Sequence, residues 1–410
     1  MKRRLMKLLG VGSCLALLAG CAPMNSEQVT DTGGTENPTV VSDWQSKVEE
    51  LKEVKPAELP EHLTLKISDT LQIDAEIAVS KEVEEYQVAE LKLTPHLFEV
   101  DIDIDRLLGL LGNPEVIERE ERTSDELLAD QETFLQVRMA YLQDGNFVQV
   151  RDNRFLVVRT LNTIYEMVDM GGYYRDLFGI SEDMANRRYQ ENGELDFMTA
   201  QEAEDVAHTF LAEMGVKDLC SLRCFACDRE NLQEEVTARI ETMQLVGLEQ
   251  SEIDAIDSTV EKKDEGYYLV AQQGYQGIPY YPTNADMSVS NNFTEIGTSI
   301  ELTVTEAGIL SAEVTGLYEP AATGEKLGIL SLGEILDTFI ARNNDENAVG
   351  PSTVRYIGLF YLPVLEDKEG MRFDALPVYC VMYDQIRETA TGYCTREYNV
   401  FDAATGERLI

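Results

Sequence analysis

Histidine and tryptophan are the scarcest residues in this 410-residue chain, which has three histidines (His62, His96 and His208) and a single tryptophan, Trp44. The sequence contains no His-Glu-x-x-His, Gly-x-Ser-x-Gly or Walker-type motif. A histidine-based metal site or catalytic triad would therefore have to be assembled from distant residues. We expect no enzymatic activity, no catalytic residue, no cofactor and no metal.

Positive charge is also in short supply, with 34 Lys and Arg against 75 Asp and Glu and a net charge of −41. Nucleic acid and anionic lipid headgroups repel such a chain. We therefore exclude DNA and RNA as partners and interpret the acidic surface as an aid to solubility. Long apolar runs are missing after residue 20, so we expect no membrane-spanning segment. The 44% hydrophobic content is nevertheless enough for folded cores.

The first 20 residues have the pattern of a secretory signal peptide. Lys2, Arg3, Arg4 and Lys7 precede an apolar core at residues 8–19, which is too short to span a bilayer. Removal of residues 1–20 leaves 30 basic against 75 acidic residues, a net charge of −45. We therefore expect an exported and strongly acidic mature chain.

The sequence Leu18-Ala19-Gly20-Cys21 resembles the lipobox of bacterial lipoproteins. The resemblance implies diacylglyceryl transfer to the Cys21 sulfur, cleavage after Gly20 and acyl groups such as palmitate. Two acyl chains anchor a protein stably, whereas one is marginal. We therefore expect a lipid anchor at Cys21 on the extracytoplasmic face of the cell membrane. The alternative is an ordinary cleaved signal in which Cys21 happens to follow Gly20.

The mature chain divides into a tether and two predicted regions. Residues 21–42 comprise the lipidated cysteine and a polar, flexible tether. Residues 43–196 form an N-terminal α+β domain in this interpretation, and residues 197–410 form a C-terminal one. The predicted fold class is α+β, with antiparallel sheets packed against helices.

In the N-terminal region, residues 43–54 look like a short helix, and alternating polarity at residues 65–79 and 86–100 predicts strands. A capping-box pattern at residues 123–126 predicts a helix that continues through Met139. Residues 147–164 predict a hairpin with its turn at residues 152–153.

In the C-terminal region, Thr199 with Glu202 predicts a helix that ends near Gly215. Helical pattern returns at residues 230–250, and strands predominate from residue 266 onward. One further helix is predicted from Ser331, with Glu334 as its capping partner, to about residue 342.

Two segments of this region share a pattern. A small-aliphatic-Pro-x-Tyr motif occurs at residues 277–281 and again at 375–379, and a glycine turn follows each of them. Gly308 lies 29 residues after Pro279, and Gly406 lies 29 residues after Pro377. We interpret this as one helix-plus-sheet unit used twice. The alternative is two unrelated hairpins with common turn chemistry.

The sequence at residues 402–407, Asp-Ala-Ala-Thr-Gly-Glu, resembles PepSY-like domains and is similar to the YycH/YycI-like domains outside the cell membrane. The run at residues 71–77, taken with the lipobox, resembles uncharacterised lipoproteins of anaerobic Gram-positive bacteria. The resemblance implies a non-catalytic protein that binds or restrains other envelope proteins. It carries over no catalytic residue.

Cys220, Cys224 and Cys227 have a spacing similar to that of radical enzymes that use S-adenosylmethionine and an iron–sulfur cluster. The aromatic residue expected directly before the third cysteine is replaced by Ala226, and the alternating strand–helix pattern of those enzymes is missing. We favour a stripe of buried thiols on a helix. Metal binding without a cluster, or a disulfide that uses one of the three, remains open.

Cys380 and Cys394 lie on either side of a predicted hairpin loop. A hairpin centred on residue 387 places the two cysteines opposite each other. Export permits a disulfide, which we predict, with two buried thiols as the alternative. Because five cysteines follow Cys21, at least one is unpaired within the monomer.

Two further patterns have ordinary explanations. Asp101, Asp103 and Asp105 imitate the start of a calcium loop, but the sixth position is Arg106 and the twelfth is Gly112, so we predict a strand end or helix start with solvated acids. The tyrosines at positions 275, 280 and 281 are interpreted as sheet packing, with a partner- or sugar-stacking surface as the alternative.

These features favour a lipid-anchored binding or regulatory module with a protein partner in the cell envelope. A lipoprotein that binds a glycan or peptide is the alternative, and an envelope hydrolase is a more remote one.

Overall fold

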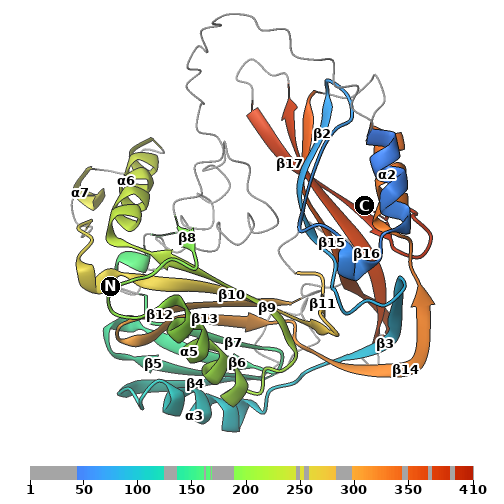
Figure 1. Ribbon diagram of the computed structural model, residues 1–410. Coiled ribbons are helices and arrows are strands. Elements are labelled where there is room, and N and C mark those ends of the chain that lie inside the picture. The colour runs from blue at the N-terminus through green and yellow to red at the C-terminus, as the bar shows by residue number, and fades with distance from the viewer. Residues whose placement is uncertain are drawn as a thin grey trace, which may run out of the picture.

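The computed structural model describes residues 44–123, 136–160, 163–166, 168, 189–245, 250–253, 258–282, 298–343, 350–367, 372–387 and 393–409. They form two large, mainly antiparallel sheets with helices packed on them, which confirms a mixed fold of helices and antiparallel-rich sheets. The two sheets lie at an angle to each other, one upright and one horizontal in the view of Figure 1. In this part of the chain no helix is long and apolar enough to cross a membrane.

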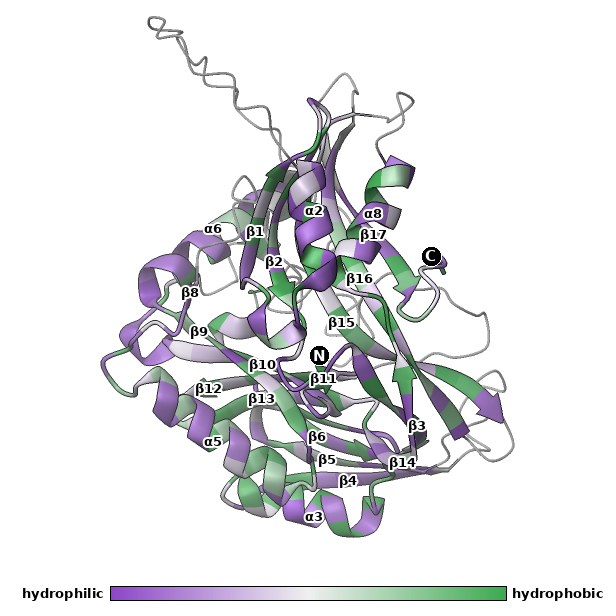
Figure 2. Cartoon of the chain, turned by 45° about the vertical axis from the view of Figure 1, so that its right-hand side comes forward, coloured by the Kyte–Doolittle hydropathy of each residue, from purple (hydrophilic) through white to green (hydrophobic). Residues whose placement is uncertain are grey.

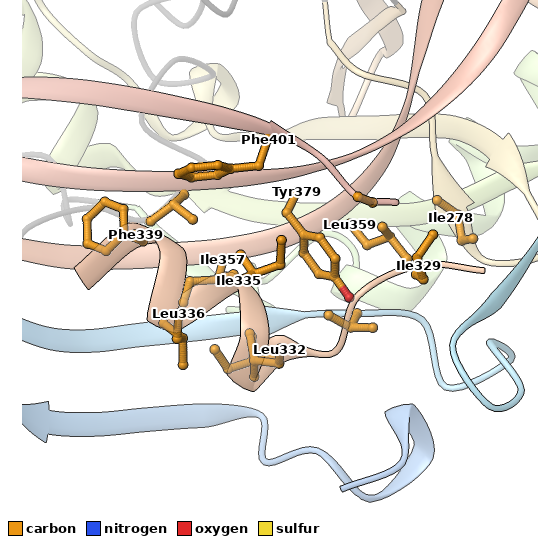
Figure 3. Close-up of a cluster of buried hydrophobic side chains, with 14 of the residues drawn as sticks. Ile278, Ile329, Leu332, Ile335, Leu336, Phe339, Ile357, Leu359, Tyr379 and Phe401 are labelled. Atoms are coloured by element: carbon orange, nitrogen blue, oxygen red, sulfur yellow. The ribbon is translucent and has the colours of Figure 1, made fainter. Parts of the chain in front are cut away.

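The first sheet contains strands from both ends of the chain. Its order is β1 (His62–Lys66), β2 (Leu71–Ala78), β15 (Ser352–Asp367), β16 (Arg372–Arg387), β3 (Gln87–Pro95) and β14 (Tyr318–Gly328), and β17 (Tyr393–Asp402) also pairs with β16. The pairing of β15 with β2 is parallel. Helices α2 (Trp44–Glu53) and α8 (Leu332–Asn343) pack together on one face of this sheet, where the apolar residues of α8 meet Ile357, Tyr379 and Phe401 (Figure 3).

The second sheet is built from the middle of the chain. Its order is β4 (Val116–Thr123), β5 (Gln136–Leu142), β6 (Phe147–Arg151), β7 (Arg154–Val158), β13 (Gly308–Thr315), β12 (Ser299–Thr305), β10 (Gly266–Tyr275), β9 (Leu219–Cys227) and β8 (Gln190–Glu191), and β11 (Ile278–Pro279) pairs with β10. Helices α3 (Val100–Leu110) and α5 (Ala200–Glu213) cover one face. Residues of α6 (Arg229–Leu245) and α7 (Gln250–Ile253) join the apolar cluster on the other face. Short 3-10 helices occupy Pro56–Glu58, Gln143–Gly145, Ile164–Glu166 and Lys262–Asp264.

The sheets cut across the boundary that the sequence suggested at residues 196 and 197. Strands β1–β3 from the N-terminal region join β14–β17 in the first sheet, and β4–β8 join β9–β13 in the second. The polarity of a strand reports which of its faces is buried but not which distant strand lies beside it. Local patterns therefore contain no information about this exchange.

Several local predictions are confirmed. Helix α2 spans the expected segment, and β6 and β7 form the expected hairpin. Thr199 and Glu202 make a reciprocal capping box at the start of α5, and Gly215 follows the helix with a φ of 81°. Ser331 and Glu334 cap α8 in the same way. In Figure 2 the exposed side of α5 is hydrophilic, as expected for a helix with one apolar face.

Other local predictions are wrong. Residues 65–79 contain the end of β1, a connection and then the antiparallel strand β2, instead of one continuous strand. The helix predicted through Met139 is contradicted at both described ends, because Thr123 closes β4 and Met139 lies in β5, paired with Glu120. Residues 124–135 of that prediction lie outside the described residues. So do residues 1–43, which include the signal, Cys21 and the tether.

The two motifs of the predicted repeat lie in different settings. Pro279 belongs to the two-residue strand β11 of the second sheet, whereas Pro377 lies inside the 16-residue strand β16 of the first. The two glycine turns are more alike, because Gly308 has a φ of 97° and Gly406 a φ of 71°. The similarity is therefore clearest at the turns.

Candidate functional site

A row of charged side chains crosses five strands of the first sheet, on the face away from α2 and α8. Arg355 on β15 donates from Nη1 to Asp74 Oδ2 on β2 at 2.9 Å and from Nε to Asp384 Oδ2 on β16 at 3.2 Å. Arg396 on β17 donates from Nε to the other oxygen of Asp384 at 3.2 Å. At the edge of the row, His62 Nε2 lies 2.8 Å from Asp74 Oδ1.

The backbone explains why these residues meet. Ile73 and Ala75 face the apolar core, so strand alternation turns Asp74 to the opposite face. The ladder shifts register between Val354 and Tyr356, which leaves Arg355 as an inserted residue relative to β16, while on the other side Asp74 and Ala75 lie opposite Arg355 alone. A bulge of this kind re-aims a side chain, and here it connects strands that are far apart in sequence.

Burial differs along the row. The side chains of Asp384 and Arg396 are 6% and 9% exposed, whereas Asp74 and His62 are partly open to solvent. The hydrogen bond from His62, opposed by burial, lowers the pKa of the Asp74 carboxyl, and the charge of Arg355 adds to this effect. Two arginines and two aspartates balance in charge, so the row presents both signs to a partner.

A second charged group belongs to the second sheet. Arg223 on β9 donates from Nε and Nη2 to the two oxygens of Glu191 on β8, at 2.9 and 2.7 Å, and its guanidinium lies 5.5 Å from the centre of the Phe225 ring. Burial opposes the charge of Arg223, but the hydrogen bonds and charge of Glu191 raise its pKa, with further contributions from Glu76 and Tyr356.

Glu76 and Tyr356 lie on the first sheet, so Arg223 interacts electrostatically with the opposite sheet. We call the residues on these facing surfaces the charged site; its members are Asp74, Glu76, Arg355, Asp384 and Arg396 on the first sheet and Glu191 and Arg223 on the second. Arg223 binds the Glu191 carboxylate through two donors beside the Phe225 ring, which is the geometry with which arginine recognises planar polar groups.

Cys220, Cys224 and Cys227 lie on a strand, β9, so the predicted helix stripe is wrong. Cys224 points to the α5 face, with its Sγ 3.9 Å from the Ala200 carbonyl oxygen, whereas Cys227 joins the apolar cluster on the α6 face. Strand alternation thus separates two of the three sulfurs by the thickness of the sheet. The described residues contain no group of three potential metal ligands. Burial was correctly expected for Cys224 and Cys227.

The cysteine thiols are held neutral. Burial raises the pKa of Cys220, Cys224 and Cys380 to about 12 and also raises that of Cys227. Because the thiolate is the reactive form, these sulfurs are poor nucleophiles near neutral pH. All four are free thiols in the part of the chain that the structure describes.

The predicted disulfide is contradicted by the register of the hairpin. Cys394 lies opposite Ile386, and Cys380 lies opposite Val400. The hairpin is therefore centred three residues later than expected, and Cys380 is six residues along β16 from the partner of Cys394. That separation is about 20 Å, far beyond the reach of a disulfide. Cys380 instead lies 3.7 Å from the Tyr281 hydroxyl oxygen.

The remaining candidates do not converge. His62 is in the charged row, His96 contacts Glu319 through Nδ1 at 3.1 Å, and His208 lies exposed on α5. The acids at 101–105 lie in the first turns of α3, as one reading expected, but Asp103 is buried and accepts the Glu99 backbone N–H at 2.7 Å. Tyr280 and Tyr281 are buried, as sheet packing predicted.

Two features were not predicted from the sequence: the charged site, and a second similarity between two segments of this chain. An arginine within the apolar strand at residues 352–364 was the available signal for Arg355.

In addition, residues 321–327 and 403–409 both read Ala-Ala-Thr-Gly-Glu followed by a basic residue and leucine. In each copy the threonine Oγ accepts the N–H of the following glutamate at 3.2 Å, and the glycine has a positive φ. The same peptide thus forms the same turn in a strand bulge and after β17.

Comparisons with known proteins place the fold but not the function. No family model matches the chain, and no curated protein matches it either. Among solved structures, the chain is similar to an uncharacterised protein from Eubacterium rectale, with a TM-score of 0.67 and 19% identity over 90% of this chain and 99% of that one. At this identity the similarity establishes a shared fold alone.

Proposed function

We propose that this protein is a non-catalytic binding or regulatory lipoprotein of the cell envelope, attached through Cys21 to the outer face of the cell membrane. The observation that carries the binding role is the charged site. Its groups range from buried to exposed and carry both signs on two facing sheets, and a polar protein segment would satisfy both signs. The lipobox sequence supports the anchor.

The partner in this proposal is an envelope protein, which can be tested by site-specific crosslinking in native membranes. A photoreactive p-benzoylphenylalanine at the exposed Glu76 should capture a partner. The same group at Asp205, exposed on α5, should not capture it. Arg223→Ala should reduce the capture at position 76, because it removes the positive charge on the second sheet that interacts with that position. Equal capture at both positions, or capture that Arg223→Ala leaves unchanged, would refute the binding site.

The anchor is tested separately by metabolic labelling with palmitate. The native chain should incorporate label and remain with the membrane fraction, whereas Cys21→Ala should lose both properties. Label that persists in Cys21→Ala would contradict lipidation at this residue.

We also propose that residues 197–410 contain two PepSY-like helix-plus-sheet units. The matching turns at Gly308 and Gly406 support this relation, and the different strands that hold Pro279 and Pro377 oppose it. Superposition of the two units in an experimental structure is the test. Agreement over a helix and three strands is expected, whereas agreement confined to the turns would refute the repeat.

A further inference from the structure

Among the described residues, the chain passes from one sheet to the other at two adjacent places. It leaves the first sheet after β3, at Pro95, and returns to it at the start of β14, at Tyr318. The two crossing segments pair with each other: Tyr318 lies opposite Pro95, and the His96 N–H donates to the Leu317 carbonyl at 2.9 Å. Two adjacent crossing segments have the connectivity of a hinge.

The crossing at Tyr318 is fixed to the second sheet by a glutamine. Gln273 on β10 is 3% exposed; its Nε2 donates to the Tyr318 carbonyl at 2.9 Å, and its Oε1 accepts the Tyr318 N–H at 2.8 Å. The side-chain amide thus binds both backbone polar groups of Tyr318, which also lies beside Pro95 of β3. This arrangement holds one end of the crossing firmly and confines any rotation to the residues beyond it.

A separate contact holds the sheets together, and we call residues 278–281 the clasp. Residues 278 and 279 are β11 of the second sheet, while Tyr280 bridges to Tyr361 of the first, and the Tyr281 N–H donates to the Tyr361 carbonyl at 2.9 Å. Ile278 and Tyr280 enter the core under α8, whereas Tyr281 packs on the opposite face, against Phe360. The clasp therefore straddles the first sheet.

The two tyrosines of this bridge differ in one respect. The Tyr361 hydroxyl donates to the Ala89 carbonyl at 2.9 Å. The Tyr280 hydroxyl is buried, in a residue that is 1% exposed, and has no hydrogen-bond partner among the described residues. A buried hydroxyl without a partner disfavours the state that buries it. The closed clasp therefore contains a group that is better satisfied when the clasp opens.

We propose that the clasp is releasable: Tyr280 and Tyr281 leave the first sheet, and the sheets separate about the two crossing segments. Opening would give a partner access to the charged site, and in that respect the inference rests on the proposed function. Its test needs no partner, so a failure here and a failure of the crosslinking experiment are distinguishable.

The test is native-state hydrogen exchange on the full mature protein. The Tyr281 amide should exchange faster than the amides of Leu269 and Val381, which lie within the two sheets and report global unfolding. Tyr280→Phe removes the unpartnered hydroxyl and should slow exchange at Tyr281 about tenfold. Tyr361→Phe is the matched control, and it should leave this exchange unchanged, because the Tyr361 hydroxyl binds the Ala89 carbonyl within the first sheet in both the closed and the open state.

Two results would overturn the proposal. One is exchange at Tyr281 as slow as at Leu269 and Val381, since the clasp would then open only with the whole protein. The other is faster exchange in Tyr280→Phe, because the hydroxyl would then stabilise the closed state. Tyr280→Phe removes a single atom from a packed ring, so it tests the proposal even where Tyr361→Phe fails to fold.

Discussion

Replacement of Asp384 by asparagine is the sharpest perturbation of the charged row. The carboxylate of Asp384 is 6% exposed and accepts hydrogen bonds from Arg355 and Arg396 through different oxygens. Asp384→Asn keeps the shape of the side chain and removes its charge, so two guanidiniums lose the acid that they share. Breaking a buried ion pair by loss of one partner costs about 3–5 kcal/mol. We expect the free energy of unfolding to fall by about that amount.

The assay is urea denaturation of the mature protein, with the midpoint and slope measured together. Asp69→Asn provides the control, because its side chain is 96% exposed although it also contacts a lysine, Lys66, at 3.0 Å. This second substitution should leave the midpoint unchanged, since surface ion pairs contribute little. A double variant with Arg396→Met should recover part of the loss, because it also removes a buried charge. Equal midpoints for Asp384→Asn and the native protein would refute the reasoning.

Three further outcomes are expected. Thr199→Ala removes the capping box of α5 and should lower the free energy of unfolding by about 1 kcal/mol in urea denaturation, and no change would contradict the role of the cap. The folded pKa of Asp74 is below its usual value, so its contribution to stability is present above about pH 4 and is lost as the pH falls through the folded pKa. His62→Gln removes the main cause of this shift. Urea midpoints measured from pH 6 to pH 2 should therefore fall less in His62→Gln than in the native protein. Cys224 and Cys380, with pKa values raised to about 12, should resist iodoacetamide at pH 8 in the folded protein and react in urea, and rapid labelling of the native state would show that they are accessible thiolates.

Helix caps and strand polarity could be predicted from the sequence where the interactions that determine them lie within a few residues. The capping boxes at Thr199 and Ser331 pair a side chain with a backbone N–H three residues away, so four residues contain the whole interaction. The alternation at residues 71–78 likewise reports a strand with one buried face. The same capping pattern gave a wrong helix prediction at residue 123, because Thr123 is the last residue of strand β4. A cap is therefore informative only when the segment after it is helical.

The charged site could not be predicted because it depends on register. Asp74 and Arg355 are 281 residues apart and meet through a parallel pairing and a bulge. The pairing of Cys380 and Cys394 depends on register in the same way, because a shift of three residues in the centre of the β16–β17 hairpin separates the two cysteines. Cysteine spacing near a loop indicates a hairpin, whereas the turn determines which residues face each other.

Because the two regions share both sheets, residues 197–410 expressed alone should not fold stably. In that fragment β15 lacks its parallel partner β2, β14 lacks β3, and β13 lacks β7. Each loss exposes a sheet edge and one side of an apolar core, and exposed edges promote aggregation. We therefore expect the fragment to be insoluble or to unfold without a cooperative transition by circular dichroism, while the mature protein unfolds cooperatively. A soluble fragment with a sharp thermal transition would instead show that residues 197–410 fold independently, and that β1–β8 only add to sheets which are already stable.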